Sequence, residues 1–241
     1  MKAPKMILFD YGQTLVNERF DGIRGTEAVL KYAVKNKYKK TAQEIQYAAN
    51  QMNQELGRFD PERRHLFQIE VPNRMFTAYL YRSLGIELSI GPEDIDRIFW
   101  EASAPGTLTD GIADFLDFLT KTGIRTGIIS NISYAGAVVK ERIDRFLPGH
   151  SFEFILATSE YMYRKPNSRI FELALEMADL KPEDVWYVGD NYQCDVIGAL
   201  NAGLYPVWYV GAATPPDRVD KHILTIAHWN QLQEFITKLP E

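Results

Sequence analysis

The 241-residue chain lacks several features that mark particular classes of protein. Its one cysteine, Cys194, cannot form an intramolecular disulfide, which suits a reducing cytoplasm. A formal net charge of −5 argues against a nucleic-acid binder, because such proteins usually carry a basic surface. The opening MKAPKMILFD has only four apolar residues in a row, too few for a signal peptide or a membrane span. We therefore expect a cytoplasmic protein without nucleic-acid or membrane partners; the oligomeric state stays unassigned.

Short apolar runs are the main structural signal that is present. They cover residues 6–9, 124–129, 152–156, 185–188 and 207–210. Each run has the length of a strand, and the lack of strict polar alternation suits strands buried on both faces. Amphipathic helical segments lie between the later runs, at 111–122, 167–178 and 195–202. This alternation predicts an α/β fold with a Rossmann-like parallel sheet core.

Residues 17–105 interrupt the alternation. Amphipathic helical stretches cover 26–35, 42–56, 74–84 and 92–102, and no segment among them has a convincing strand pattern. We expect a second, smaller all-helical domain over residues 17–105, inserted into a core made of residues 1–16 and 106–241.

Polar residues follow three of the apolar runs. Asp10 follows the first run, Ser130 the second, and Gly189-Asp190 the fourth. Any one of them alone could be a loop residue or a helix N-cap. In an open α/β sheet, however, the carboxyl ends of the strands line the ligand crevice. The set therefore predicts a single site at this edge of the sheet.

Four segments, in this order, resemble the sequence motifs of the haloacid dehalogenase superfamily. They are Asp10-Tyr11-Gly12-Gln13-Thr14-Leu15, Ser130, Arg164-Lys165-Pro166 and residues 189–195, a Gly-Asp-x4-Asp pattern. The resemblance covers residues 1–16 and 106–241, and the helical insert is similar to the cap domain that these proteins carry after the first motif. It implies a hydrolase, with a Mg²⁺-dependent phosphatase of small phosphorylated metabolites as the main expectation.

The resemblance also implies a role for each motif residue. Asp10 is the expected nucleophile, which forms an aspartyl-phosphate, and Lys165 is the expected catalytic cation. The expected Mg²⁺ site consists of Asp10, the carbonyl of Gly12, Asp190 and Asp195, the last acting through water or by orienting the others. The expected substrate contacts are Thr14, Ser130, Asn131 and Lys165.

Gly12 departs from the family pattern. The phosphatases of this superfamily carry an aspartate there, which protonates the leaving group and then activates water. Such proton transfer is worth roughly 10²–10⁴ in rate. Gln13 cannot act as an acid, and Tyr11 is expected to point to the opposite side. The sequence therefore predicts a site that binds Mg²⁺ and an anion but hydrolyses many phosphate esters slowly.

Alternatives to a slow phosphatase follow from this departure. A phosphonate-cleaving enzyme would need a cap lysine such as Lys31 or Lys35, and a dehalogenase would not need the acidic segment at 189–195. A phospho-ligand-binding protein without turnover is also compatible with the motifs. The candidates for cap residues that contact substrate are Arg19, Phe20, Arg24, Arg58, Arg63, Arg64 and His65.

Overall fold

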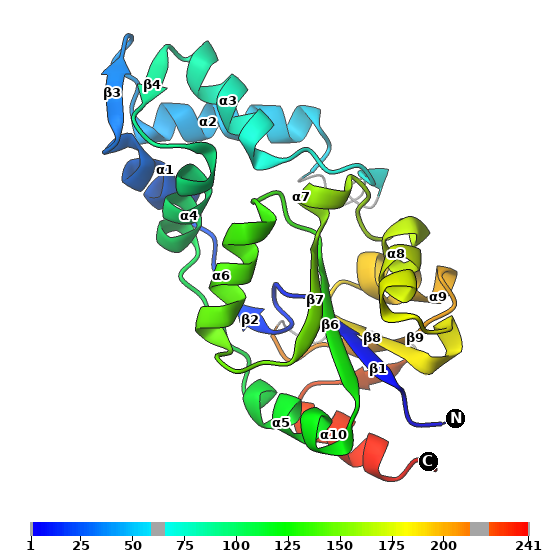
Figure 1. Cartoon of the computed structure of the whole chain (residues 1–241). Helices are drawn as coiled ribbons and strands as arrows, with labels where there is room; N and C mark the ends of the chain where they lie inside the picture. The colour runs from blue at the N-terminus through cyan, green and yellow to red at the C-terminus, as the bar shows by residue number, and fades with distance from the viewer. Residues whose placement is uncertain (1, 59–65, 213–221, 241) are drawn as a thin grey trace.

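A computed structural model describes residues 2–58, 66–212 and 222–240 (Figure 1). The strands of its main sheet are β1 (Met6–Phe9), β6 (Arg125–Ser130), β7 (Phe152–Ala157), β8 (Val185–Gly189), β9 (Tyr205–Tyr209) and β10 (Leu224–Ile226). They are all parallel and lie in the order β10-β9-β8-β1-β6-β7. The α/β fold with a Rossmann-like core is confirmed. The five apolar runs form strands, and β10 is a sixth strand that the sequence pattern did not predict.

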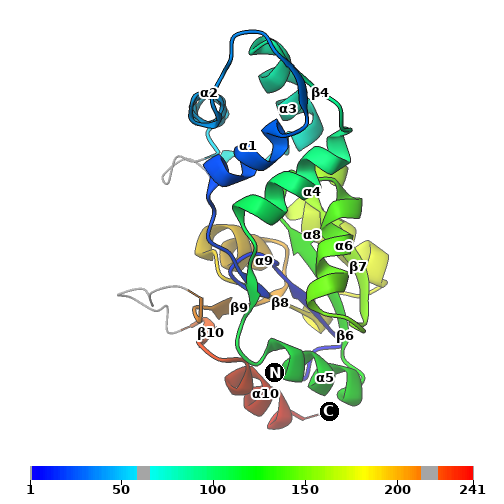
Figure 2. The ribbon, with the colours of Figure 1, turned by 90° about the vertical axis from the view of Figure 1, so that its left-hand side faces the viewer.

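Helices cover both faces of this sheet, as Figures 1 and 2 show. Alternate side chains of β1 enter different hydrophobic clusters, with Ile7 and Phe9 on one face and Met6 and Leu8 on the other. The first face packs against α5 (Ile112–Thr122), α6 (Gly136–Phe146) and α10 (Trp229–Thr237). The second packs against α8 (Ser168–Ala178) and α9 (Gly198–Asn201). The central strands are therefore buried on both sides, as their mainly apolar sequences indicated.

The insert lies above the carboxyl ends of the strands (Figure 1). Its elements are α1 (Gly22–Leu30), β3 (Ala33–Asn36), α2 (Ala42–Glu55), α3 (Asn73–Ser83), β4 (Ile86–Leu88) and α4 (Pro92–Ser103). They enclose a hydrophobic cluster of their own, which includes Val29, Ile45 and Phe76. Two short antiparallel strands, β2 (Val16–Asn17) and β5 (Thr107–Leu108), connect the insert to the core. Domain boundaries at 16/17 and 105/106 stay a prediction.

Two of the expected helices differ from the structure. The helix predicted over 26–35 ends at Leu30, and residues 33–36 form β3, which pairs with β4. The insert is thus mainly helical but contains one short two-stranded antiparallel sheet. The sequence did not predict this sheet, because the two strands lie about fifty residues apart in the chain and leave no local signal. The helix predicted over 195–202 begins earlier, as the π-helix η3 (Tyr192–Ile197), and continues into α9.

The insert also contacts the core through the backbone of residues 68–70. Ile69 and Tyr163 form an isolated antiparallel bridge, and the amide of Glu70 donates to the carbonyl of Met162 at 2.6 Å.

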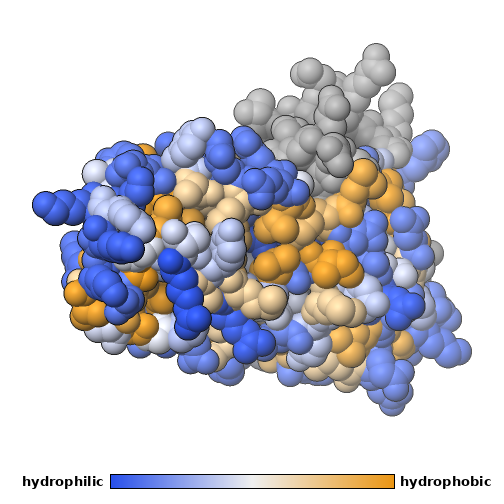
Figure 3. Space-filling model, turned by 90° about the horizontal axis from the view of Figure 1, so that it is seen from above, coloured by the Kyte–Doolittle hydropathy of each residue, from blue (hydrophilic) through white to orange (hydrophobic). Residues whose placement is uncertain are grey.

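Seen from above, the end of the molecule that carries the insert has hydrophobic residues among mostly hydrophilic ones (Figure 3). The remaining short elements are α7 (Thr158–Tyr161) and η2 (Pro182–Asp184). No helix in the described parts of the chain has the length and apolar composition of a membrane span.

Candidate active site

The order of the sheet strands brings the predicted carboxylates together. The chain leaves β1 toward β6 and β7 and later returns to the other side of β1 with β8, so a topological switch point lies between β1 and β8. Ligand crevices in open α/β sheets form at such points. Asp10 follows β1 and Asp190 follows β8, while Asp195 lies on η3. One oxygen from each of these three carboxylates lies within 4.8 Å of the others.

Lys165 lies at the centre of this cluster and is buried. Its Nζ donates to Asp10 Oδ1 at 2.7 Å and to Asp195 Oδ1 at 2.7 Å. A third bond joins Nζ to the hydroxyl of Tyr187 at 2.5 Å, and this hydroxyl donates to the carbonyl of Ile129 at 2.9 Å. The ammonium is therefore fixed between the first and fourth motif segments.

Asn131 holds the backbone of Lys165 in place. The amide of Lys165 donates to Asn131 Oδ1 at 2.8 Å, and Asn131 Nδ2 donates to the carbonyl of Lys165 at 2.8 Å. Both polar atoms of this carboxamide are thus engaged with the lysine. A substrate contact from Asn131 stays a prediction, and the structure adds a positioning role that the sequence analysis did not anticipate.

The cluster carries more negative charge than Lys165 can balance. Burial raises the pKa of Asp10 to about 6, although Lys165 opposes this shift. Burial, followed by repulsion from Asp10 and Asp195, raises the pKa of Asp190 to about 8. Three carboxylates and one ammonium leave a charge of −2 when all are ionised. An all-oxygen donor set with this surplus fits a hard divalent cation such as Mg²⁺.

Asp195 is oriented by contacts to both of its oxygens. Oδ1 accepts from Lys165, and Oδ2 accepts from the amide of Asn191 at 2.8 Å. A Cβ on Gly189 would lie 2.3 Å from Asp195 Cγ, so only glycine lets this carboxylate approach the end of β8 so closely. These contacts favour an orienting role for Asp195 within the predicted metal site.

Gly12 leaves open space where the superfamily's phosphatases carry their second aspartate. An ideal Cβ at this position would have no atom within 4 Å. Tyr11 points away from the site, because its hydroxyl accepts from Arg142 Nε at 2.9 Å in the core. Gln13 donates from Nε2 to the carbonyl of Glu18 at 2.6 Å. Neither neighbour provides the missing acid.

Thr14 and Ser130 are both buried beside this cluster. Within the described residues, the hydroxyl of Thr14 has no hydrogen-bond partner, and its carbonyl accepts from the hydroxyl of Thr109 at 2.8 Å. Ser130 is the last residue of β6, next to β1 in the sheet. Their predicted contacts with a phosphoryl group stay predictions.

Tyr187 is the residue at the site that sequence reasoning missed. It lies in the middle of the apolar strand β8 and resembles an ordinary core aromatic. The available signal was its spacing from Gly189, since residues two apart in a strand share a face. Only the fold shows that Lys165 Nζ donates to the hydroxyl of Tyr187.

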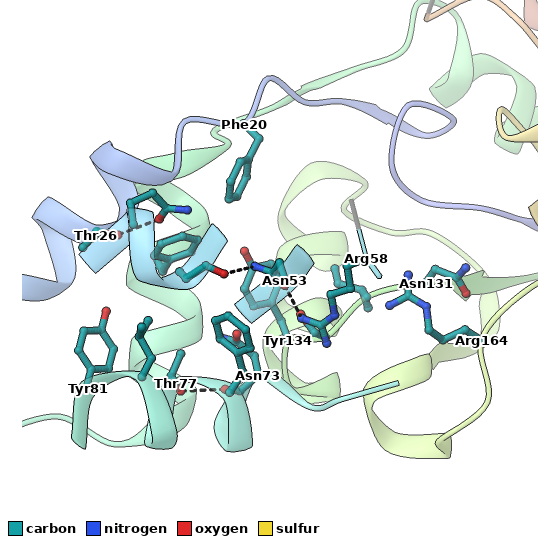
Figure 4. Close-up of a pocket in the computed structure, with 17 residues that line it drawn as sticks. Phe20, Thr26, Asn53, Arg58, Asn73, Thr77, Tyr81, Asn131, Tyr134 and Arg164 are labelled. Carbon is teal, nitrogen blue, oxygen red and sulfur yellow. Dashed lines mark hydrogen bonds between the residues drawn. The ribbon is translucent and has the colours of Figure 1, made fainter. Parts of the chain in front are cut away.

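A pocket of about 390 Å³ lies between the insert and the loops that follow β6 (Figure 4). Two predicted cap contacts, Phe20 and Arg58, line it, whereas Arg19 and Arg24 are not among its described lining residues. Arg63, Arg64 and His65 lie outside the described residues. Asn131 and Arg164 also line the pocket, and they directly neighbour Ser130 and Lys165 in the chain. One end of the pocket therefore lies next to the segments that carry Ser130 and Lys165.

A family profile described as haloacid dehalogenase-like hydrolase matches residues 4–203. Glyceraldehyde 3-phosphate phosphatase of Methanothermobacter thermautotrophicus is 34% identical over 125 residues, covering 49% of this chain and about half, 54%, of that protein. Pyrimidine 5'-nucleotidase YjjG of Escherichia coli is 28% identical over 206 residues, which is 84% of each chain. The crystal structure of 2-haloacid dehalogenase from Pseudomonas syringae pv. Tomato shares the fold, with a TM-score of 0.67 and 18% identity over 98% of this chain and 99% of that one. With its fold, its ordered motif segments and a profile match over most of its length, the chain belongs to the haloacid dehalogenase-like hydrolase family.

Proposed function

We propose that the protein is a Mg²⁺-dependent phosphatase that hydrolyses a small phosphorylated metabolite through an aspartyl-phosphate on Asp10. The observation that carries this proposal is the meeting of three carboxylates around Lys165 at the switch point of the sheet. Two relatives whose names describe phosphate-ester hydrolysis support the same reaction class.

The proposed reaction has two displacement steps at phosphorus. In the first, an Asp10 oxygen attacks phosphorus, the bond to the ester oxygen breaks, and the alcohol oxygen leaves with the electron pair. In the second, water attacks the same phosphorus, the bond between phosphorus and the Asp10 oxygen breaks, Asp10 is regenerated as a carboxylate, and the proton of the water is lost to solvent as phosphate leaves. The charge of Lys165 favours the ionised form of Asp10 and would also offset the negative charge of the phosphoryl group.

The residues of this chain provide a place for the cation. Asp10, Asp190 and the carbonyl of Gly12 would hold Mg²⁺, while Asp195 orients the cluster through Lys165 and the amide of Asn191. Bound Mg²⁺ would offset the negative charge of the phosphoryl group as the anionic nucleophile approaches.

The acidity of the leaving alcohol should determine the rate of the proposed reaction. Because Gly12 offers no proton donor, the alcohol must leave without an acid at this position. We propose that the protein prefers esters with acidic alcohols or substrates that supply their own proton. A phosphonate-cleaving reaction has less support, because Lys31 and Lys35 are absent from the described pocket lining and Lys35 is paired with Glu87 at 2.5 Å.

Hydrolysis of p-nitrophenyl phosphate tests the proposed function directly. We expect turnover that requires Mg²⁺ and stops when EDTA is added. Asp10→Asn should abolish turnover, because an amide is a far weaker nucleophile than a carboxylate. Thermal unfolding of this variant checks that the fold is kept. Turnover that ignores EDTA, or that persists in the folded Asp10→Asn protein, would contradict the proposal.

A further inference from the structure

Two arginines in the pocket share a single carboxylate. Arg58 Nη2 donates to Glu70 Oε1 at 3.0 Å, and Arg164 Nη1 donates to Glu70 Oε2 at 2.6 Å. The side chain of Glu70 is fully buried, and its Oε2 also accepts from the hydroxyl of Thr158 at 2.8 Å. Two guanidinium groups and one carboxylate leave one positive charge without a counterion in this group.

The buried hydrogen bonds of the two arginines are also incomplete. Arg58 uses Nη1 and Nη2 to contact Asn53, Glu70 and Val71. Within the described residues, however, Nε of Arg58 and Nε of Arg164 are both buried without a partner. A buried guanidinium nitrogen without an acceptor costs free energy. An anion in the pocket could balance the surplus charge of the two guanidinium groups. Burial also lowers the pKa of Arg58, and repulsion from Arg164 adds to this although Glu70 opposes it.

The rest of the pocket is mostly apolar and aromatic. Figure 4 shows Arg58, Asn131 and Arg164 at one end, with Thr26 and Tyr81 at the other. Rings from the insert and from the loop after β6 line the space between, and they include Phe20, Phe76, Phe99 and Tyr134. The charged end lies nearest the catalytic cluster, because Asn131 and Arg164 directly neighbour Ser130 and Lys165.

We propose that this pocket binds the leaving group of the substrate, and that this group carries a carboxylate for Arg58 and Arg164 and an aromatic or apolar body for the rings beyond. A carboxylate matches the single surplus charge better than a second phosphate, which carries nearly two negative charges at neutral pH. The inference rests on the proposed phosphatase function, since it defines the alcohol part of the same substrate.

A purely structural link between the insert and the core does not by itself account for two arginines around Glu70. Glu70 does join the two parts, because Arg58 and Glu70 belong to the insert while Thr158 and Arg164 belong to the core. The hydrogen bonds of this link to Glu70 use only Nη atoms of the arginines. The link needs one arginine for charge balance, and it leaves both Nε atoms buried and unused.

Aryl phosphates that differ mainly in charge test the proposal. The probes are the meta and para carboxyphenyl phosphates, each compared with the neutral carboxamide of similar shape, because a carboxyl group at the ortho position could pass its own proton to the leaving oxygen. For at least one isomer, we expect kcat/KM to be about tenfold or more higher for the carboxylate than for the carboxamide. A ratio near one for both isomers would overturn the inference while leaving the phosphatase proposal intact.

Substitution of the arginines should remove this preference. In Arg164→Gln and in Arg58→Gln, the carboxylate-to-carboxamide ratio should fall toward one, because each change removes a positive charge at the charged end of the pocket. Arg169→Gln is the matched control, since Arg169 is an exposed arginine of the same segment outside the pocket. An unchanged ratio in folded Arg164→Gln would contradict the assignment, even if Arg58→Gln does not fold.

Binding of the leaving alcohols alone distinguishes the proposed anion pocket from the proposed phosphatase function. Calorimetry would compare each hydroxybenzoate with its hydroxybenzamide on the wild-type protein. If no aryl phosphate is hydrolysed, the proposed function fails, yet tighter binding of a hydroxybenzoate would still support the anion pocket. Equal binding of the charged and neutral alcohols would overturn it.

Discussion

Gly12 is the residue that departs from the family pattern at the proposed site, and we expect it to limit the rate of the reaction. It retains the backbone carbonyl that the predicted metal site needs and lacks the carboxylate that would protonate a leaving alcohol. The space beside it is empty enough for a side chain, and its backbone is not in the left-handed region that excludes one. The glycine is therefore not required by packing.

Gly12→Asp should raise the rate of alkyl phosphate hydrolysis by about tenfold or more, because a general acid helps most when the alcohol is a poor leaving group. The measurement is phosphate release from glycerol 2-phosphate, with p-nitrophenyl phosphate alongside, where a smaller gain is expected. Gly12→Asn is the matched control, since its carboxamide has the same shape but no acidic proton to transfer. A folded Gly12→Asp protein that is no faster than Gly12→Asn would show that the missing acid does not limit turnover.

Helix α6 joins the core to both connections of the insert through one buried side chain. Arg142 donates from Nε to Tyr11 in the first motif and from Nη2 to Glu18 at 2.9 Å. It also donates to Glu101 at 3.1 Å and to the carbonyl of Ala104, at the end of α4. A single element thus fixes where the insert leaves and re-enters the core.

Arg142→Met should lower the free energy of unfolding by about 3 kcal/mol, because it leaves the largely buried Glu18 without its cationic partner. Urea denaturation measures this loss. Arg145→Met is the matched control on the same helix, since Arg145 is 52% exposed and pairs only with Glu101 among the described ion pairs. Its loss should stay below about 1 kcal/mol. Equal losses in the two variants would contradict the proposed role of Arg142.

The charge of the carboxylate cluster couples the stability of the whole molecule to pH and Mg²⁺. The pKa of Asp190 is raised from 3.8 to about 8, so the folded protein holds a proton there that the unfolded chain has lost. Stability of the metal-free protein should therefore fall as pH rises between these values. Mg²⁺ binds the ionised form and should recover the loss.

The increase in Tm caused by a fixed Mg²⁺ concentration should consequently be larger at about pH 8.5 than at about pH 6. Between about pH 8 and pH 6, each unit of decrease in pH should weaken the apparent Mg²⁺ affinity about tenfold, because one proton must leave Asp190. Thermal unfolding with and without Mg²⁺ measures the effect. Asp190→Asn is the control and should lose both the increase and its pH dependence. A Mg²⁺ effect that grows toward low pH would contradict the assignment.

The local sequence determined the strands of the sheet and the residues of the site that lie at its carboxyl edge. Most strands of the sheet are short, mainly apolar runs, and the residue after such a run lies at the carboxyl edge of the sheet wherever the strand stands in the order. This is why the sequence alone predicts that Asp10 and Asp190 lie together. The resemblance of the motif segments to the family then pointed to Lys165 and Asp195, which the structure brings to the same cluster.

Tertiary structure alone decided which side chains complete the site. The bond from Lys165 to Tyr187, the pairing of β3 with β4, and the sharing of Glu70 by Arg58 and Arg164 join residues that are far apart in the chain. Short strands such as β10, β3 and β4 have too few residues for a periodic signal. A hydrophobic pattern records only which face of an element is buried, whereas the partner that it meets there depends on how all the elements pack together.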